Sequence, residues 1–304
     1  MTAPARPRRF HHRDFTVADL RARRERVCVL LPAREEARTI GAILDVLVGL
    51  RESGALDDVL VIDARSADGT AQVAARAGAR VAQRDDLLAE FGPALGKGDA
   101  VWRGLSATDA EIVCVLDADL EDFDERYVLG LVGPLLREPG LALVKGAFAR
   151  PYTASDGTVT PGEGGRVTEL MARPLLALLH PELAGFSQPL SGQWAARREL
   201  LAALEFWTGY ALEICLLLEA HDRAGLHALA ECDLGTLVNR HQPLGELGSM
   251  ASAVLRGVLE RLVARGRLPP LPAAPATDGA APAILPRPPL ATITPGARPL
   301  PSCA

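Results

Sequence analysis

The sequence predicts an α/β fold whose first half is a mostly parallel sheet wrapped by helices. Three observations support this prediction. Short apolar runs alternate with stretches of helical periodicity over roughly the first 150 residues. These apolar runs are continuous, which is typical of strands buried on both faces in a parallel sheet. Turn and helix-start residues follow several of the runs, as expected where helices cross over between parallel strands.

Each element of this half has its own signal. Val27–Leu31 is an apolar run that Pro32 closes. Ser66–Thr70 is a turn that leads into a helix, which Gly78 ends. The same reasoning predicts strands at 27–31, 58–62, 80–82, 112–116 and 142–148, and helices at 17–24, 39–50, 70–77, 98–107 and 127–136. This order predicts a Rossmann-like unit of strands and crossover helices.

The alternation weakens after residue 150. The Gly/Ser/Thr-rich stretch 152–165 is expected to be a mobile loop, and amphipathic helices are expected at 167–179, 210–224 and 247–265. Eleven of the 23 prolines and nine alanines fall in the last 37 residues, so we expect a disordered tail there. The chain therefore divides into 1–150, a more helical unit at 151–267, and the Pro/Ala-rich tail at 268–304.

Composition argues against several classes of protein. The net charge is −5 and the pI is near 5.8, which argues against general nucleic-acid binding. No apolar run reaches the roughly 18–20 residues that cross a bilayer, and the basic N-terminus lacks the apolar region of a secretory signal. The five cysteines are far apart and form no C-x-x-C pair, which is typical of reduced thiols. We therefore expect a cytoplasmic protein that binds neither nucleic acid nor membranes.

The strongest chemical signal is Asp117-Ala118-Asp119, which directly follows the apolar run 112–116. Open α/β sheets bind ligands at the carboxyl ends of their strands, so both carboxylates are expected to face a crevice. This D-x-D arrangement is typical of sugar-nucleotide glycosyltransferases, in which Mg²⁺ or Mn²⁺ bridges a carboxylate to a diphosphate. D-x-D alone is common, and the plain alternative is a solvated turn after a strand.

Three neighbouring segments favour the first interpretation. Leu31–Glu36 resembles the P-A-x-N/D-E nucleotide-binding turn, although an acidic pair also stabilises a helix start. Asp63–Thr70 matches a D-x-x-S-x-D-x-T turn, in which Ser66 either caps the helix or touches the nucleoside. Gly96-Lys97-Gly98 combines a close backbone approach with an ammonium that neutralises phosphate. In this order the four segments resemble a GT-A glycosyltransferase.

Four segments of the second half narrow the family: Gly165–Leu170, Gln188–Ala195, Gly209–Ile214 and Asn239–Leu244. They closely resemble the retaining glucosyl-3-phosphoglycerate synthases of actinobacteria, and the resemblance runs from about Phe15 to Arg265. It implies a nucleotide-sugar half at 1–150 and an acceptor half at 151–267. It also implies a hexosyltransferase that moves glucose from UDP-glucose to the 2-hydroxyl of 3-phospho-D-glycerate with retention.

The resemblance implies a role for each matching residue. The UDP-sugar would be lined by Leu31, Pro32, Ala33, Glu36, Ser66, Lys97, Asp117 and Ala118. The acceptor and the glucose would be held by Gly165, Arg166, Val167, Thr168, Tyr210, Glu213, Asn239, Arg240 and His241. The catalytic residues would be Asp119, Glu213, Lys97 and Leu190. The plain alternatives are a solvated surface arginine for Arg166 and a surface acid for Glu213. No carboxylate beyond Glu213 is placed as a nucleophile, so positioning and charge stabilisation would carry the rate.

One departure from the family pattern concerns the metal. The family commonly has a histidine ligand in an H-R-N segment, whereas this chain reads Asn239-Arg240-His241. Register alone puts Asn239 at the ligand position, but imidazole suits Mn²⁺ or Mg²⁺ better than an amide does, which favours His241. The candidate ligands are therefore Asp119, His241 and Asn239. The plain alternative for His241 is a surface histidine before Pro243.

Lysine is rare in this chain. Of the 33 basic residues only Lys97 and Lys145 are lysines, and the other 31 are arginines. Lys97 lies in the G-K-G turn, and Lys145 ends an apolar run just before the acceptor loop. We expect both on the rim of the active site, because a compact ammonium fits a crowded diphosphate site where a guanidinium does not.

Oligomeric state and function leave alternatives. Because the family is commonly dimeric, we expect a homodimer, with the helix at 247–265 as a candidate interface. Another donor or acceptor, as in mannosyl-3-phosphoglycerate synthase, is one alternative function. A nucleotidyltransferase would need a basic, Gly-rich turn where this chain has Glu35 and Glu36. A non-catalytic sugar-nucleotide-binding protein would account for the exchanged Asn239 and His241.

Overall fold

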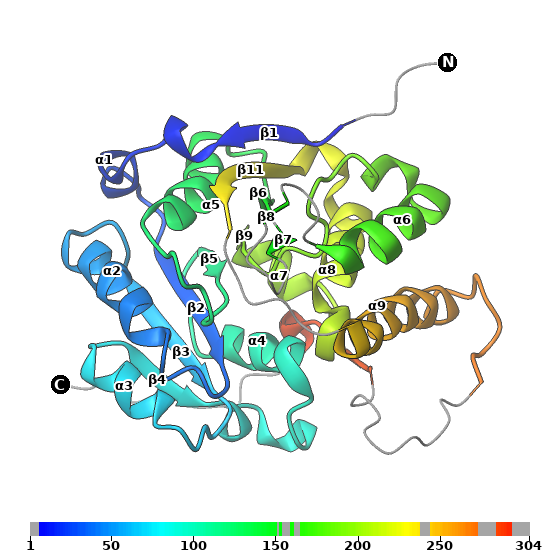
Figure 1. Ribbon diagram of the computed structural model, residues 1–304, viewed down its shortest axis with the longest axis horizontal. Coiled ribbons are helices and arrows are strands. Elements are labelled where there is room, and N and C mark those ends of the chain that lie inside the picture. Colours follow the sequence, from blue (N-terminus) through cyan, green and yellow to red (C-terminus); the bar gives the residue numbers. More distant parts are fainter. Residues whose placement is uncertain are drawn as a thin grey trace.

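One eight-stranded sheet forms the centre of the protein, with strand order β1-β11-β6-β9-β5-β2-β3-β4 (Figure 1). The computed structural model describes residues 6–150, 152–153, 159–160, 165–237, 244–272 and 284–293. The strands are β1 Arg8–His11, β2 Val27–Ala33, β3 Asp58–Asp63, β4 Arg80–Gln83, β5 Ile112–Val115, β6 Leu143–Ala149, β9 Trp194–Arg197 and β11 Leu229–Thr236. All neighbouring strands are parallel except β9, which runs antiparallel to β5 and β6.

Helices cover both faces of this sheet, and a hydrophobic core lies on each. The helices are α1 Val17–Arg21, α2 Ile40–Glu52, α3 Thr70–Arg76, α4 Gly96–Ser106, α5 Arg126–Arg137, α6 Arg173–Leu179, α7 Arg198–Ala203, α8 Leu212–Ala224 and α9 Leu244–Ala264. Strand β2 shows why its apolar run is continuous. Val27, Val29 and Leu31 enter the core beneath α2 and α5, whereas Cys28 and Leu30 enter the core beneath α4 and α8.

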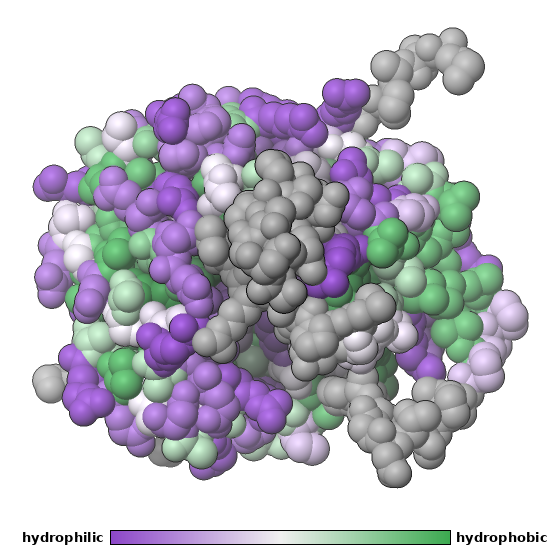
Figure 2. All heavy atoms as spheres, viewed as in Figure 1, coloured by the Kyte–Doolittle hydropathy of each residue, from purple (hydrophilic) through white to green (hydrophobic). Residues whose placement is uncertain are grey.

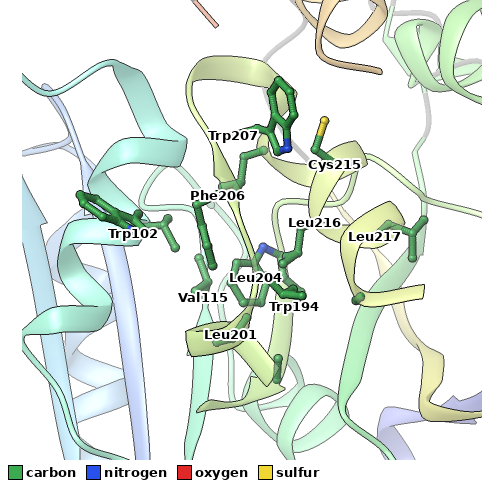
Figure 3. Close-up of a cluster of buried hydrophobic side chains, with 14 of the residues drawn as sticks. Trp102, Val115, Trp194, Leu201, Leu204, Phe206, Trp207, Cys215, Leu216 and Leu217 are labelled. Carbon is green, nitrogen blue, oxygen red and sulfur yellow. The ribbon is translucent and has the colours of Figure 1, made fainter. Parts of the chain in front are cut away.

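The core beneath α4 and α8 joins elements that are distant in sequence (Figure 3). Trp102 of α4, Trp194 of β9 and Trp207 of the short strand β10 (Phe206–Trp207) are all buried there. These three indole rings bury large apolar areas and so contribute strongly to stability. The elements that approach the carboxyl end of β5 are therefore held by a rigid base.

Every strand and helix expected in the first half is present, with bounds shifted by a few residues. Three strands of the central sheet are not among those expected. β11 alternates apolar and polar residues, β9 is short and ends in an arginine, and β1 is a polar strand that pairs only with β11 at the sheet edge. The polar, Arg-rich residues before α1 carry no strand signal, and β1 forms because pairing with a neighbouring strand outweighs its low β-propensity.

The Pro-rich segment contains an ordered part. Residues 284–293 form strand β12 (Pro286–Arg287) and the 3₁₀ turn η8 (Leu290–Thr292), and β12 pairs antiparallel with β10. The expectation of a disordered tail does not hold for these residues, because Ile284 enters the core and Arg287 is buried. Residues 273–283 and 294–304 lie outside the described part of the chain.

The stretch expected to be a mobile loop is described only in part. Two short strands, β7 (Tyr152–Thr153) and β8 (Val159–Thr160), pair antiparallel there. The expected helix at 167–179 begins with a π-helical turn, η4 (Thr168–Ala172), before α6. Among the helices that the structure describes, none has the length and hydropathy of a membrane span.

Candidate active site

The turns that follow β2 and β3 are locked together by side chains. The Glu35 N–H donates to Ser66 Oγ at 2.9 Å, and the Glu36 N–H donates to Thr70 Oγ1 at 2.9 Å. Ser66 therefore caps the turn after β2 rather than helix α3, whose first residue follows Gly69 at φ 90°. Both turns lie at the carboxyl ends of the neighbouring parallel strands β2 and β3. The residues there that are predicted to line the UDP-sugar are Leu31, Pro32, Ala33, Glu36 and Ser66.

Lys97, at the start of α4, is the cation at the centre of the site. Its Nζ contacts the Asp117 carboxylate and lies 2.8 Å from Glu213 Oε1 at the start of α8. Burial alone would lower the pKa of Lys97, but Asp117 and Glu213 raise it well above its usual value. Lys97 is therefore a permanent positive charge between two carboxylates.

Gln193 holds Asp117 from the other side. Its Nε2 donates to Asp117 Oδ2 at 2.7 Å, and its Oε1 accepts the Asp117 N–H at 2.9 Å. Burial would raise the pKa of Asp117, but Lys97 and the Gln193 amide keep that pKa below its usual value. Gly192 next to it allows this close approach, because a Cβ there would lie 2.3 Å from Asp117 Oδ2 and 2.7 Å from Lys97 Nζ.

Asp119 and Glu36 form the acidic part of the site. Burial, together with the nearby Asp119 and Asp117, raises the pKa of Glu36 to about 7. The pKa of Asp119 is raised, first because its carboxyl group is partly desolvated and second because Asp117 lies nearby. The residue as a whole is nevertheless open to solvent. Carboxylates that oppose one another's ionisation favour a bound cation.

The carboxylates at this end of the sheet suit a divalent metal ion that also binds the phosphates of a substrate. In the described part of the chain no group of three acidic, histidine or cysteine side chains encloses a metal by itself. Mg²⁺ is typically held by one or two carboxylates plus substrate phosphates, and Asp119 stays the predicted carboxylate ligand, because Asp117 is already paired with Lys97 and Gln193. The other candidate ligands, Asn239 and His241, lie outside the described residues, as does Arg240.

Lys145 lies beneath the site and not on its rim. It is 1% exposed within strand β6, and its Nζ donates to the Ser191 carbonyl at 3.0 Å. Burial lowers its pKa to about 7, which Glu213 partly opposes. Lys145 therefore supports the Leu190–Gly192 turn from below, and the expectation that it sits on the rim is wrong because β6 continues past it.

The predicted acceptor residues lie where the chain enters η4. Gly165 has φ 74°, a left-handed conformation that favours glycine, and Thr168 is buried at the first position of η4. Arg166 and Val167 between them are half-buried. Backbone N–H groups and an arginine at such a helix start suit an anionic ligand.

Arg150 connects this anion site to the aspartates. A Cβ on Gly165 would lie 3.6 Å from Arg150 Cδ, and Asp117 and Asp119 both act on the Arg150 guanidinium. Its Nε is buried and has no hydrogen-bond partner among the described residues. Burial lowers the pKa of this guanidinium, so an anion placed here would gain a poorly hydrated cation as its partner.

Tyr210 and Glu213 begin the last element of the site. Tyr210, in the 3₁₀ turn η6 (Gly209–Ala211), is 48% exposed, whereas Glu213 is 7% exposed and faces Lys97. The surface-acid interpretation of Glu213 is therefore wrong. The structure brings Lys97, Asp117 and Glu213 into contact from three separate elements.

Sequence reasoning assigned no role to Gln193, Gly192 or Arg150. Gln193 and Gly192 lie inside the Gln188–Ala195 segment, in which the resemblance implies a role for Leu190 alone. Arg150 follows β6 directly, so its place at the carboxyl end of a parallel strand was the available signal.

Comparison with known proteins identifies relatives along most of the chain. Residues 28–174 match the family model "Glycosyl transferase family 2". Glucosyl-3-phosphoglycerate synthase of Mycobacterium tuberculosis is 44% identical over 256 residues, which is 83% of this chain and 79% of that protein. The enzyme of the same name from Petrotoga mobilis is 37% identical over 268 residues, 86% of this chain and 82% of that protein.

Solved structures agree with these relatives. Mannosyl-3-phosphoglycerate synthase from Rubrobacter xylanophilus superposes with a TM-score of 0.83 at 39% identity, covering 93% of this chain and 96% of that one. Glucosyl-3-phosphoglycerate synthase from M. tuberculosis with Mn²⁺, UDP-glucose and phosphoglyceric acid gives 0.82 at 38% identity, covering 94% and 98%. The M. tuberculosis enzyme with Mg²⁺ and UDP gives 0.76 at 42% identity, covering 84% and 86%.

Proposed function

Since this chain belongs to the glucosyl-3-phosphoglycerate synthases of glycosyl transferase family 2, we propose that it moves glucose from UDP-glucose to the 2-hydroxyl of 3-phospho-D-glycerate. The product is glucosyl-3-phosphoglycerate, formed with retention at the anomeric carbon. The observation that carries the proposal is the contact of Lys97 with both Asp117 and Glu213 at the carboxyl end of β5. A nucleoside diphosphate sugar needs a fixed cation and a polar group for its hexose at that place.

The donor half of the reaction uses the turns after β2, β3 and β5. Asp117 would contact the nucleoside, Lys97 would neutralise the leaving diphosphate, and Glu213 would hold a hydroxyl of the glucose. Mg²⁺ or Mn²⁺ bound at Asp119 would supply Lewis-acid stabilisation of the leaving UDP. Leu190 precedes Ser191, whose carbonyl accepts a hydrogen bond from Lys145, and this turn would line the place of the reacting sugar.

The acceptor half uses the start of η4. Gly165, Arg166 and Thr168 would bind the phosphate and carboxylate of 3-phosphoglycerate, and Arg150 would extend this site toward Asp119. Held in this way, the acceptor 2-hydroxyl attacks the face of the anomeric carbon that UDP leaves. Its proton passes to the departing phosphate oxygen, so no enzymic nucleophile is required. Both halves contribute strands to one sheet. The division at about residue 150 would therefore separate donor binding from acceptor binding, and not two sheets.

The donor sugar has a second candidate. A structural relative is a mannosyl-3-phosphoglycerate synthase with a TM-score of 0.83, so mannose transfer from a nucleotide sugar is the alternative. The test is a panel of UDP-glucose, GDP-glucose and GDP-mannose with 3-phosphoglycerate and Mn²⁺, in which nucleotide release is measured. Glucosyl transfer predicts the highest kcat/KM with UDP-glucose; faster turnover of GDP-mannose would favour the alternative.

We further propose a homodimer, with η4 and α6 at the interface. Leu170 and Leu178 are 76% and 82% exposed, and Figure 2 shows hydrophobic surface over α6. Helix α9, the expected interface, instead turns Val254, Val258 and Leu262 into the protomer. Leu178→Glu should convert a dimer into a monomer in sedimentation experiments, and an unchanged mass would exclude this surface.

A cytoplasmic location belongs with this function. The structure describes four cysteines, all free and buried: Cys28, Cys114, Cys215 and Cys232. Free thiols are typical of proteins that fold in a reducing compartment.

A further inference from the structure

We propose that residues 284–293 form a strap that positions the Lys97–Glu213 pair, and that Arg287 anchors it. The strap deepens the proposed glucosyl transfer and rests on it. Arg287 touches no substrate in this account, so it is a positioning residue and not a catalytic one. Two sets of contacts carry the proposal, one to α4 and the loop before it and one to β10.

The first set joins the strap to the start of α4. Arg287 is 9% exposed, and its Nε donates to Asp99 Oδ1 at 3.0 Å. The same guanidinium donates from Nη1 to the Phe91 carbonyl at 2.9 Å. The Trp102 Nε1 donates to the Pro288 carbonyl at 2.9 Å. Asp99 is two residues after Lys97, so the anchor acts on the turn that carries the catalytic ammonium.

The second set joins the strap to the segment that leads into α8. Strand β12 pairs with β10, so that Arg287 lies opposite Phe206. The Thr208 N–H donates to the Leu285 carbonyl at 3.0 Å, and the Leu285 N–H donates to Thr208 Oγ1 at 2.9 Å. Thr208 comes five residues before Glu213, which is the second residue of α8 and is separated from η6 only by Leu212.

The two segments that the strap joins are packed backbone against backbone. The Gly209 N–H donates to the Leu95 carbonyl at 3.0 Å. A Cβ on Gly98 would lie 2.1 Å from the Trp207 carbonyl oxygen. Lys97 is next to Gly98 in the sequence and Glu213 comes four residues after Gly209, so this approach limits the distance between the two segments whose side chains meet. The strap bonds to both segments, and we infer that it holds them in a fixed position relative to each other.

The contacts predict an effect on the donor site only. Within the described part of the chain, the strap's hydrogen bonds and ion pairs go to α4, the loop before it and β10, and none goes to residues 165–168. Loss of the strap should therefore weaken binding of UDP-glucose and lower kcat, and leave 3-phosphoglycerate affinity unchanged. A segment that merely adds stability would affect both ligands alike.

The test compares a chain ending at residue 283 with a matched chain ending at residue 293, and Arg287→Ala with Arg267→Ala, an exposed arginine. Calorimetry measures the Kd of UDP with Mn²⁺ and the Kd of 3-phosphoglycerate, and steady-state kinetics measures kcat. We expect a loss of at least about tenfold in UDP affinity or kcat for the chain ending at 283 and for Arg287→Ala. The 3-phosphoglycerate Kd and both controls should stay within about twofold of the intact chain.

Two results would overturn the proposed role of the strap. One is an unchanged UDP affinity and kcat in both strap variants, and the other is an equal loss of affinity for UDP and for 3-phosphoglycerate together with a lowered Tm. Should the chain ending at 283 fail to fold, Trp102→Phe and Arg287→Lys decide, with a smaller donor-specific loss supporting the strap and no such loss excluding it. An intact chain that binds both ligands but transfers no glucose overturns the proposed function and leaves the donor-affinity test of the strap in force.

Discussion

The Lys97 ammonium lies 2.8 Å from Glu213 Oε1 and at the same time contacts the Asp117 carboxylate. The two acids are 96 residues apart in the sequence and belong to different halves of the chain. The Lys97–Glu213 contact thus joins the nucleotide half to the helical half at the point where the sugar would bind.

Replacement of Lys97 by arginine should abolish most activity although the charge is kept. Gly192 leaves no spare room, because even a Cβ there would lie 2.7 Å from Lys97 Nζ. A planar guanidinium cannot enter that space without displacing Asp117 or Glu213. We expect kcat/KM for UDP-glucose to fall by about 100-fold or more. Full activity of Lys97→Arg would show that the site tolerates any cation there.

Gln193→Leu should shift the pH profile of the reaction. The Gln193 amide helps to keep the pKa of Asp117 low, and the leucine removes that hydrogen bond from a buried carboxylate. Asp117 acts as an anion, so the acidic limb of kcat/KM should move to higher pH. The exposed Gln72→Leu is the matched control, and identical acidic limbs in the two variants would exclude this role.

Binding of Mn²⁺ should release protons near neutral pH. The pKa of Glu36 is raised to about 7, and a cation beside it favours the ionised form. Calorimetry in buffers of different ionisation enthalpy should detect more proton release at pH 6.5 than at pH 8.5. Glu36→Gln should remove most of this difference. Equal release at both pH values in the intact chain would contradict the raised pKa.

Gly98→Ala should destabilise the protein, and Gly49→Ala should not. The new Cβ at residue 98 would meet the Trp207 carbonyl oxygen at 2.1 Å, whereas nothing lies within 4 Å of one at residue 49 in α2. We expect a loss of about 1–3 kcal/mol in the free energy of unfolding for Gly98→Ala. Gly49→Ala should gain up to about 1 kcal/mol from helix propensity. Equal values in urea unfolding would contradict the close packing of α4 on β10.

Lys145 should make the protein less stable at low pH. Its folded-state pKa of about 7 lies below that of an unfolded lysine, so the unfolded chain binds the extra proton between these values. Stability from this group therefore rises as pH increases above 7. Lys145→Met removes the cost, so its stability advantage over the intact chain should shrink between pH 7 and pH 9. A constant difference would contradict the lowered pKa.

The first half of the fold followed from the sequence because its strands are buried on both faces and carry continuous apolar runs. Strands β1, β9 and β11 escaped prediction because their signals depend on neighbours that are distant in sequence. Arg287 shows the same limit at the other end of the chain. Proline and alanine content predicts disorder there, but the buried pair of Arg287 with Asp99 and the pairing of β12 with β10 depend on residues that are distant in sequence.

The residues of the candidate site could be predicted where a short motif follows a strand. The side chains that support those residues from neighbouring strands could not. Lys97, Asp117, Asp119 and Glu213 could be named because each lies in a short motif at the end of a strand or the start of a helix. The support that Gln193 gives to Asp117 depends on β9 running antiparallel to β5, which no local pattern indicates.

The central claim is glucosyl transfer to the 2-hydroxyl of 3-phosphoglycerate with retention. The most direct measurement is proton NMR of the purified chain with UDP-glucose, 3-phosphoglycerate and the diamagnetic Mg²⁺, with Asp119→Ala as the control. We expect an α-glucoside at the acceptor's second carbon with the intact chain and none with the control. A β-anomer, a product with another sugar only, or no transfer at all would contradict it.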